Sequence, residues 1–76
     1  MYIVSQDGTI VNNEAIVAII IKEKDDKWVI LADTVSCYAY FLGEFDTLEI
    51  AVAEKSKIIK NLIADDSLIY EVTRTE

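Results

Sequence analysis

Three stretches of the chain are apolar at consecutive positions rather than at every second position. The longest covers residues 15–21 (AIVAIII), and the others cover 28–32 (WVILA) and 37–42 (CYAYFL). A strand with one face in water alternates polar and apolar side chains, whereas a strand covered on both faces is apolar throughout. The pattern therefore predicts strands at Ala15–Glu23, Trp28–Asp33 and Cys37–Leu42 that are buried from both sides.

Short polar segments separate these strands. Residues 24–27 (KDDK) and 34–36 (TVS) are long enough only for tight connections, which predicts an antiparallel meander. Earlier in the chain, Asp7-Gly8 is a strong turn signal because glycine accepts a positive φ without steric cost. The first dozen residues are therefore predicted to form a small hairpin.

The hydrophobic period changes after Gly43, from strand to helix. Asp46 or Thr47 can cap a helix, and Asp46 has capping-box spacing with Glu49. The helix is predicted to run from 47 to about 64, because the acidic pair 65–66 is unfavourable at the negative end of a helix dipole. Its apolar positions fall in one wide arc: Leu48, Ala51, Val52, Ile58, Ile59, Leu62 and Ile63.

Residues 67–73 are predicted to form a last short strand at the sheet edge. The chain as a whole is then one small α+β domain, residues 1–76. We expect an antiparallel meander of four to six strands, with the single helix packed on one face.

One helix can shield only one face of such a sheet, which leaves apolar surface over. A chain of 76 residues buries only about 60% of its unfolded surface, and Cys37 as the only cysteine excludes an internal disulfide. Self-association is the remaining way to cover that surface, and a homodimer is the first expectation. We expect the interface on the sheet, at Val17, Ile19, Ile21, Trp28, Ile30, Tyr38 and Tyr40.

The aromatic members of this set have a second interpretation. Aromatic side chains on neighbouring strands also stabilise a sheet through cross-strand pairs. Tyr38 and Tyr40 are predicted to share one face, with Cys37, Ala39 and Phe41 on the other.

The formal charge of −7 argues against direct binding to nucleic acid or to an anionic membrane. It leaves one alternative function, an acidic protein that mimics nucleic acid and inhibits a DNA- or RNA-binding protein. Such a mimic needs carboxylates arrayed at phosphate-like spacing. Here Lys22, Lys24 and Lys27 interrupt the acids around the 24–27 turn. An interaction or assembly module is therefore the first functional hypothesis.

Enzyme chemistry has little support in the sequence. The chain contains no histidine, so its serines cannot form a serine–histidine triad and a zinc site is disfavoured. The paired acids at 25–26 and 65–66 do not match a calcium-binding loop and are interpreted as solvated turn residues. Cys37 has apolar neighbours and is expected to behave as a small buried hydrophobic residue. We expect no enzyme activity, cofactor or metal.

Lys55 is the one charge that projects into the middle of the apolar arc of the predicted helix. It can be a buried lysine paired with a carboxylate, or its aliphatic stem can lie on the core while the ammonium reaches water. The second interpretation is the more common in proteins, and the sequence leaves the choice open.

The chain shows no signal for export or for membrane insertion. No apolar run reaches the roughly 18 residues that span a bilayer. The first residues, Met1 to Ser5, have neither a basic start nor a small-residue cleavage site. Together with the lone cysteine, this predicts a cytoplasmic protein.

Two motifs resemble those of a class of small phage and prophage proteins from low-GC Gram-positive bacteria. The first is SQDG at residues 5–8 followed by Val11-Asn12, and the second is LGEF at residues 42–45 followed by Thr47, Glu49 and Ala51. The resemblance spans most of the chain but departs at 54–57, where similar proteins carry apolar residues. It implies a mobile-element setting and phage or host proteins as partners, and it implies no mechanism.

Overall fold

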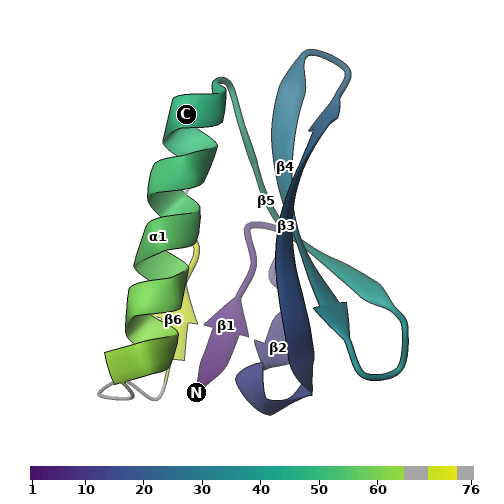
Figure 1. Ribbon diagram of the computed structural model, residues 1–76, viewed down its shortest axis with the longest axis vertical. Coiled ribbons are helices and arrows are strands. Elements are labelled where there is room, and N and C mark those ends of the chain that lie inside the picture. Colours follow the sequence, from purple (N-terminus) through teal and green to yellow (C-terminus); the bar gives the residue numbers. More distant parts are fainter. Residues whose placement is uncertain (65–68, 74–76) are drawn as a thin grey trace.

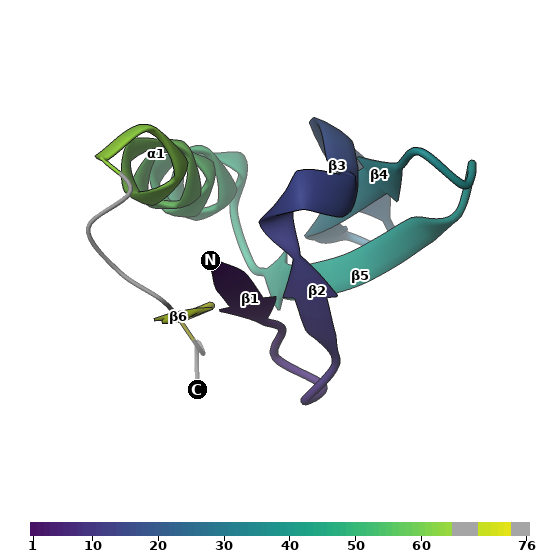
Figure 2. The ribbon, with the colours of Figure 1, turned by 90° about the horizontal axis from the view of Figure 1, so that it is seen from below.

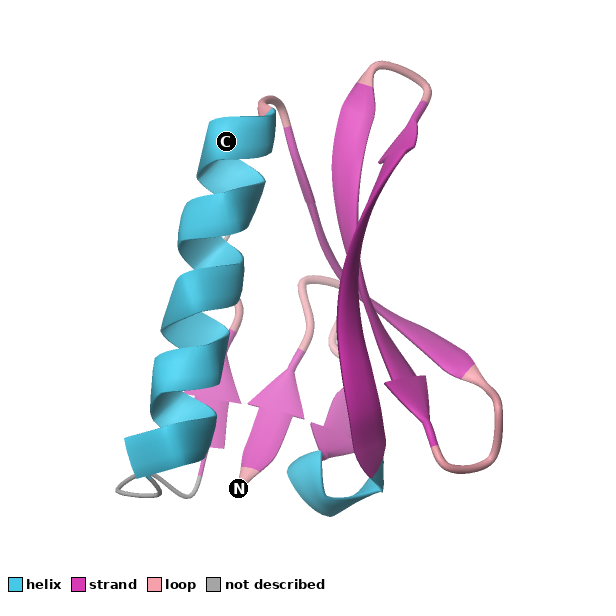
Figure 3. Ribbon diagram, viewed as in Figure 1, coloured by secondary structure: helices cyan, strands magenta, loops and turns pink. Residues whose placement is uncertain are grey.

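The computed structural model describes residues 1–64 and 69–73 and contains two three-stranded sheets and one long helix (Figures 1 and 3). The predicted α+β class, a strand-rich meander with one helix, is confirmed. In chain order the elements are β1 (Tyr2–Val4), β2 (Ile10–Asn12), the 3-10 turn η1 (Asn13–Ala15), β3 (Ile16–Lys24), β4 (Lys27–Thr34), β5 (Ala39–Phe45), α1 (Leu48–Ala64) and β6 (Ile69–Glu71).

The larger sheet is the predicted antiparallel meander, with strand order β3-β4-β5. β3 and β4 are joined by the two-residue loop Asp25-Asp26, where both residues have positive φ, 51° and 64°. This is the primed turn geometry that matches the twist of a hairpin, and aspartate tolerates it better than most residues. A register shift between Ile30 and Leu31 marks a bulge against β5.

The smaller sheet has strand order β2-β1-β6. β1 and β2 form the predicted hairpin, and Gly8 takes the positive φ of 89° that its turn requires. β6 joins the edge of this sheet as predicted, but it runs parallel to β1. Parallel strands need a long crossover, which β3 to α1 supply, so the strands divide into two sheets instead of one continuous meander. Residues 65–68, part of the predicted helix end and last strand, lie outside the described residues.

Gln6 ties the two sheets together. Its backbone N–H donates to the carbonyl of Leu42 in β5 at 2.9 Å, and its side-chain oxygen accepts from the N–H of Glu44 at 2.8 Å. Its side-chain amide also donates to the carbonyl of Thr73, just after β6, at 2.7 Å. One side chain at the β1–β2 turn therefore fixes the larger sheet and the C-terminal strand relative to each other.

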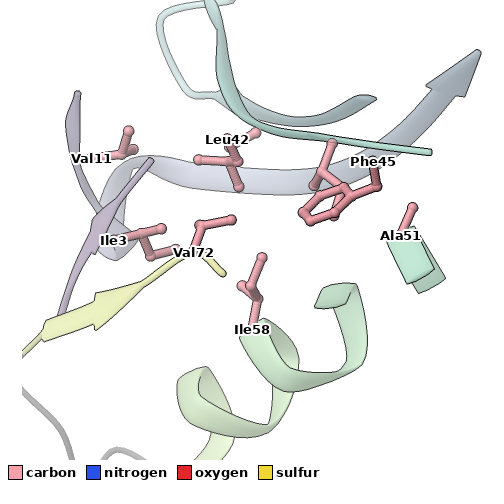
Figure 4. Close-up of a cluster of buried hydrophobic side chains, with 9 residues drawn as sticks. Ile3, Val11, Leu42, Phe45, Ala51, Ile58 and Val72 are labelled. Carbon is pink, nitrogen blue, oxygen red and sulfur yellow. The ribbon is translucent and has the colours of Figure 1, made fainter. Parts of the chain in front are cut away.

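The core lies where both sheets and the helix meet (Figure 4). Figure 2 shows α1 over one side of the molecule, with β1 and β6 below it and β3 to β5 beyond. Thr47 caps the helix by accepting the N–H of Ile50, whereas Asp46 pairs with Lys27 instead. The fully buried apolar residues are Ile3, Val11, Ile30, Ala32, Leu42, Phe45, Ala51, Ile58 and Val72.

We expect Gly43→Ala to destabilise the fold by about 1–3 kcal/mol, as over-packing does in a tight core. A methyl group at Gly43 would lie 3.0 Å from two carbons of the buried Phe45 ring and 3.1 Å from Gln6. The measurement is the free energy of unfolding by denaturant, with Glu44→Ala at the adjacent exposed position as the control. An unchanged value for Gly43→Ala would show that the Phe45 ring has room to move.

Candidate functional site

The outer face of the larger sheet carries apolar side chains that the helix does not cover. In the register of the sheet Ile20 lies opposite Leu31, and Leu31 lies opposite Phe41, so the three form a row across the strands. Beside them Val29 is buried, whereas 39% of Ile20 remains exposed. Val29, Leu31 and Phe41 are the apolar residues that line an open groove of about 660 Å³ on this face, and Ile20 lies beside it, opposite Leu31.

Charged residues of both signs border this groove. Lys22 and Lys24 lie on β3, Glu44 lies across the sheet on β5, and Glu23 and Asp25 complete the lining near the hairpin tip. An apolar floor with a polar border is the usual composition of a protein–protein interface. The outer face is therefore the better candidate for contact with another protein than for chemistry on a small molecule.

The residues predicted for the interface lie mostly on the opposite face. Ile30 is fully buried, so its assignment to an interface is wrong. Val17 and Tyr38 are exposed, and the Tyr38 and Tyr40 rings pack edge to face at 4.6 Å, which confirms that they share a face. The remaining predicted residues pack against the core and are only partly exposed: Ile19, Ile21, Trp28 and Tyr40.

The sequence could not distinguish the two faces of these strands. In β4 the set Trp28, Ile30 and Ala32 faces the core, while Val29 and Leu31 face outward, and both sets are apolar. The helix decides which set joins the core cluster, because Ala51 and Ile58 pack on the Ile30 side. The outward row at Ile20, Leu31 and Phe41 was missed for this reason.

Among the described residues one charged side chain is buried, the carboxylate of Glu54, and the sequence did not predict it. It is 3% exposed and lies on α1 facing β6. Its Oε2 accepts the Tyr70 hydroxyl at 2.6 Å and the Thr73 backbone N–H at 3.0 Å, and the Lys57 ammonium lies 4.0 Å from Oε1. These partners replace the water that a carboxylate loses on burial, so Glu54 attaches β6 to the helix.

The hydrogen bonds of Glu54 hold parts of the chain together. Both hydrogen bonds are made to groups of the chain itself, and Glu54 lines neither the groove on the outer face nor the hollow at Tyr2, Val4, Ile10 and Ile69. Burial raises the pKa of the Tyr70 phenol above its ordinary value of 10.0, and the hydrogen bond to Glu54 raises the pKa further. The phenol therefore stays a donor to Glu54.

Two other expectations are settled by the structure. Lys55 is partly exposed, so it is not a fully buried lysine. The charged residue that is buried on this helix is its neighbour Glu54. Cys37 is exposed and has a positive φ of 66° in the turn before β5, so the prediction of a buried strand residue is wrong. The strand begins two residues later, at Ala39, because the chain needs 35–38 to reverse direction.

Within residues 1–64 and 69–73, no helix combines the length and the apolar character needed to cross a bilayer. The same residues contain no cluster of three or more side chains able to hold a metal ion.

We predict that Glu54 and Tyr70 are energetically coupled. Glu54→Ala leaves a partly buried hydroxyl and an N–H without a partner, and Tyr70→Phe removes the donor alone. A double-mutant cycle measured by denaturant unfolding should give a coupling of about 1.5–3 kcal/mol, the range for hydrogen bonds to charged groups. Glu49→Ala, an exposed acid on the same helix, should show none with Tyr70→Phe. Additive effects at positions 54 and 70 would contradict the attachment of β6 by this bond.

The raised pKa of Tyr70 also predicts a pH dependence of stability. Above pH 10.0 the unfolded chain loses the phenol proton while the folded chain keeps it, so the free energy of unfolding falls as the pH rises. Lys27, whose pKa Asp46 raises, adds to this alkaline loss in every variant. Tyr70→Phe should therefore show a shallower decline above that pH than the wild type. If the free energies of unfolding of the wild type and of Tyr70→Phe fell in parallel, the Tyr70 hydroxyl would have to be exposed to water in the folded chain.

The chain was compared with family models, curated proteins and solved structures, and none of them matched.

Proposed function

We propose that this chain is a non-enzymatic protein-interaction module that assembles with copies of itself through the sheet β3-β4-β5. The observation that carries the proposal is the apolar surface of this sheet that the helix leaves uncovered along the edge strand β3, where Val17 and Ile20 are exposed. Burying such surface between two chains supplies the stability that a core of this size lacks.

The charge distribution supports a second copy as the partner. Two chains of net charge −7 repel each other at most orientations. β3 is different, because Lys22, Glu23 and Lys24 give it a net charge of +1 (two positive and one negative). Two copies that approach at β3 therefore meet little of the acid–acid repulsion that the net charge of the chain produces elsewhere.

The acidic mimic is less well supported. The hairpin tip, where the acids Glu23, Asp25 and Asp26 gather, also carries three of the chain's lysines. A run of phosphate-like charges is interrupted there. The phage or prophage setting and the phage or host partners stay predictions of the resemblance. The cytoplasmic location stays a prediction from the lone cysteine and the lack of an export signal.

Sedimentation velocity over a range of micromolar concentrations tests the proposal. We expect the wild type to sediment as a dimer or larger species of the 8.6 kDa chain and to dissociate on dilution. Ile20→Glu places a charge in the uncovered surface without entering the core, and it should shift the protein to monomer with its circular dichroism unchanged.

Val35→Glu is the matched control, because Val35 is 70% exposed and lies in the connection between β4 and β5. This variant should assemble as the wild type does. A wild type that stays a folded monomer over the whole concentration range would overturn the proposed function.

A further inference from the structure

We infer that two copies pair through the free edge of β3 around a two-fold axis at Ile20, forming a six-stranded sheet with both helices on the same side. The inference rests on the proposed self-association and names its contact. It uses the β3 edge and one stripe of α1, and it leaves the outer groove open in each copy.

The first observation is an unpaired edge of nine residues. β3 pairs only with β4 among the described residues. The residues flanking a two-residue hairpin loop, Lys24 and Lys27, form a hydrogen-bonded pair, and the pattern alternates along an antiparallel ladder. The backbone groups of Ile19, Ile21 and Glu23 therefore point to the free edge. Figure 1 shows β3 in front of β4 and β5, with that edge uncovered.

The second observation is that this edge is complementary to itself. Antiparallel pairing centred on Ile20 uses all of β3 and places Ile19 opposite the second copy's Ile21. Both residues present backbone groups to the edge, so each such pair exchanges two hydrogen bonds. Ile20 meets its own copy on the outer face.

The charges fit the same register. Lys22 lies opposite the second copy's Ala18, and Ala18 pairs with Asp33 on β4 within its own sheet. The lysine and that aspartate are then two strands apart on one face, about 10 Å between backbones, which the long lysine side chain spans. No like charges are placed opposite each other along the pair.

The third observation is an apolar stripe on the helix that the fold leaves without a partner. At about 100° per residue, Glu54 lies on one flank of the buried positions Ala51 and Ile58, and the stripe lies on the other flank. Glu54 faces β6, so the stripe is turned away from β6 and towards the β3 side (Figure 2). All of its members are exposed: Leu48, Val52, Ile59 and Ile63.

The two-fold axis brings the β3 edge and the helix stripe of each copy against those of the other. Pairing that continues a sheet keeps its two faces distinct, so the helix of the second copy lies on the same face as the first and runs beside it. The stripes of the two helices then face each other above Ile19 and Ile21, which the single chain buries only in part. One contact thus covers the edge, the stripe and the open border of the core.

The helix stripe is tested with a matched pair of substitutions. Val52→Glu and Ile50→Glu alter residues of similar exposure, 47% and 40%, on opposite flanks of one helix. We expect Val52→Glu to raise the dimer dissociation constant by roughly tenfold or more, as loss of a central contact does, and Ile50→Glu to leave it unchanged. Leu31→Glu, in the outer groove, should also leave it unchanged.

The register is tested by a disulfide. Ile20→Cys in a Cys37→Ser background should form a covalent dimer under mild oxidation, because the two cysteines would face each other at the axis. Ile10→Cys in the same background, an exposed site on the smaller sheet, should not. An oligomer that dissociates with Leu31→Glu, tolerates Val52→Glu and forms no such disulfide would overturn the β3 dimer while the proposed self-association stands. A wild type that stays monomeric would overturn both the β3 dimer and the proposed self-association.

Discussion

The whole structure depends on how one 17-residue helix is shared between two small sheets. A sheet of three strands joined by tight turns has two faces, and the helix can cover only one of them. The second sheet does not cover the other face. It packs around the helix instead, where Ile3 and Val72 join the same core as Phe45 and Ile58. The fold thus gains one shared core at the cost of leaving the outer face of the larger sheet exposed.

The attachment of β6 explains why the helix has its particular rotation. The apolar arc alone centres the helix near Lys55, with Val52 and Ile59 turned inward. The observed helix is turned so that Glu54 reaches Tyr70 and Thr73. A carboxylate with two hydrogen-bond donors can be buried at little cost, whereas an unpaired one cannot. This rotation exposes the stripe that begins at Leu48.

Local signals in the sequence predicted the elements well, because each depends on neighbouring residues. The Asp-Gly turn, the charged hairpin loop at 24–27 and the cap at Thr47 all lie where propensity and spacing put them. The predictions that failed depend on distant partners. The burial of Ile30 is decided by the helix, and the burial of Glu54 by a strand that follows it in the chain. The periodicity of an apolar strand contains neither piece of information.

The same reasoning explains why β3 is the exposed strand. A natural edge strand is usually short, bulged or charged, which prevents unwanted pairing. β3 has a bulge near Ile16 and charges from Lys22 onward, but Ile19 to Ile21 lie between them without such protection. This gap in protection coincides with the exposed stripe of α1 on the same side. It is the pattern expected when a second copy covers the unprotected edge, as in the self-association that we propose.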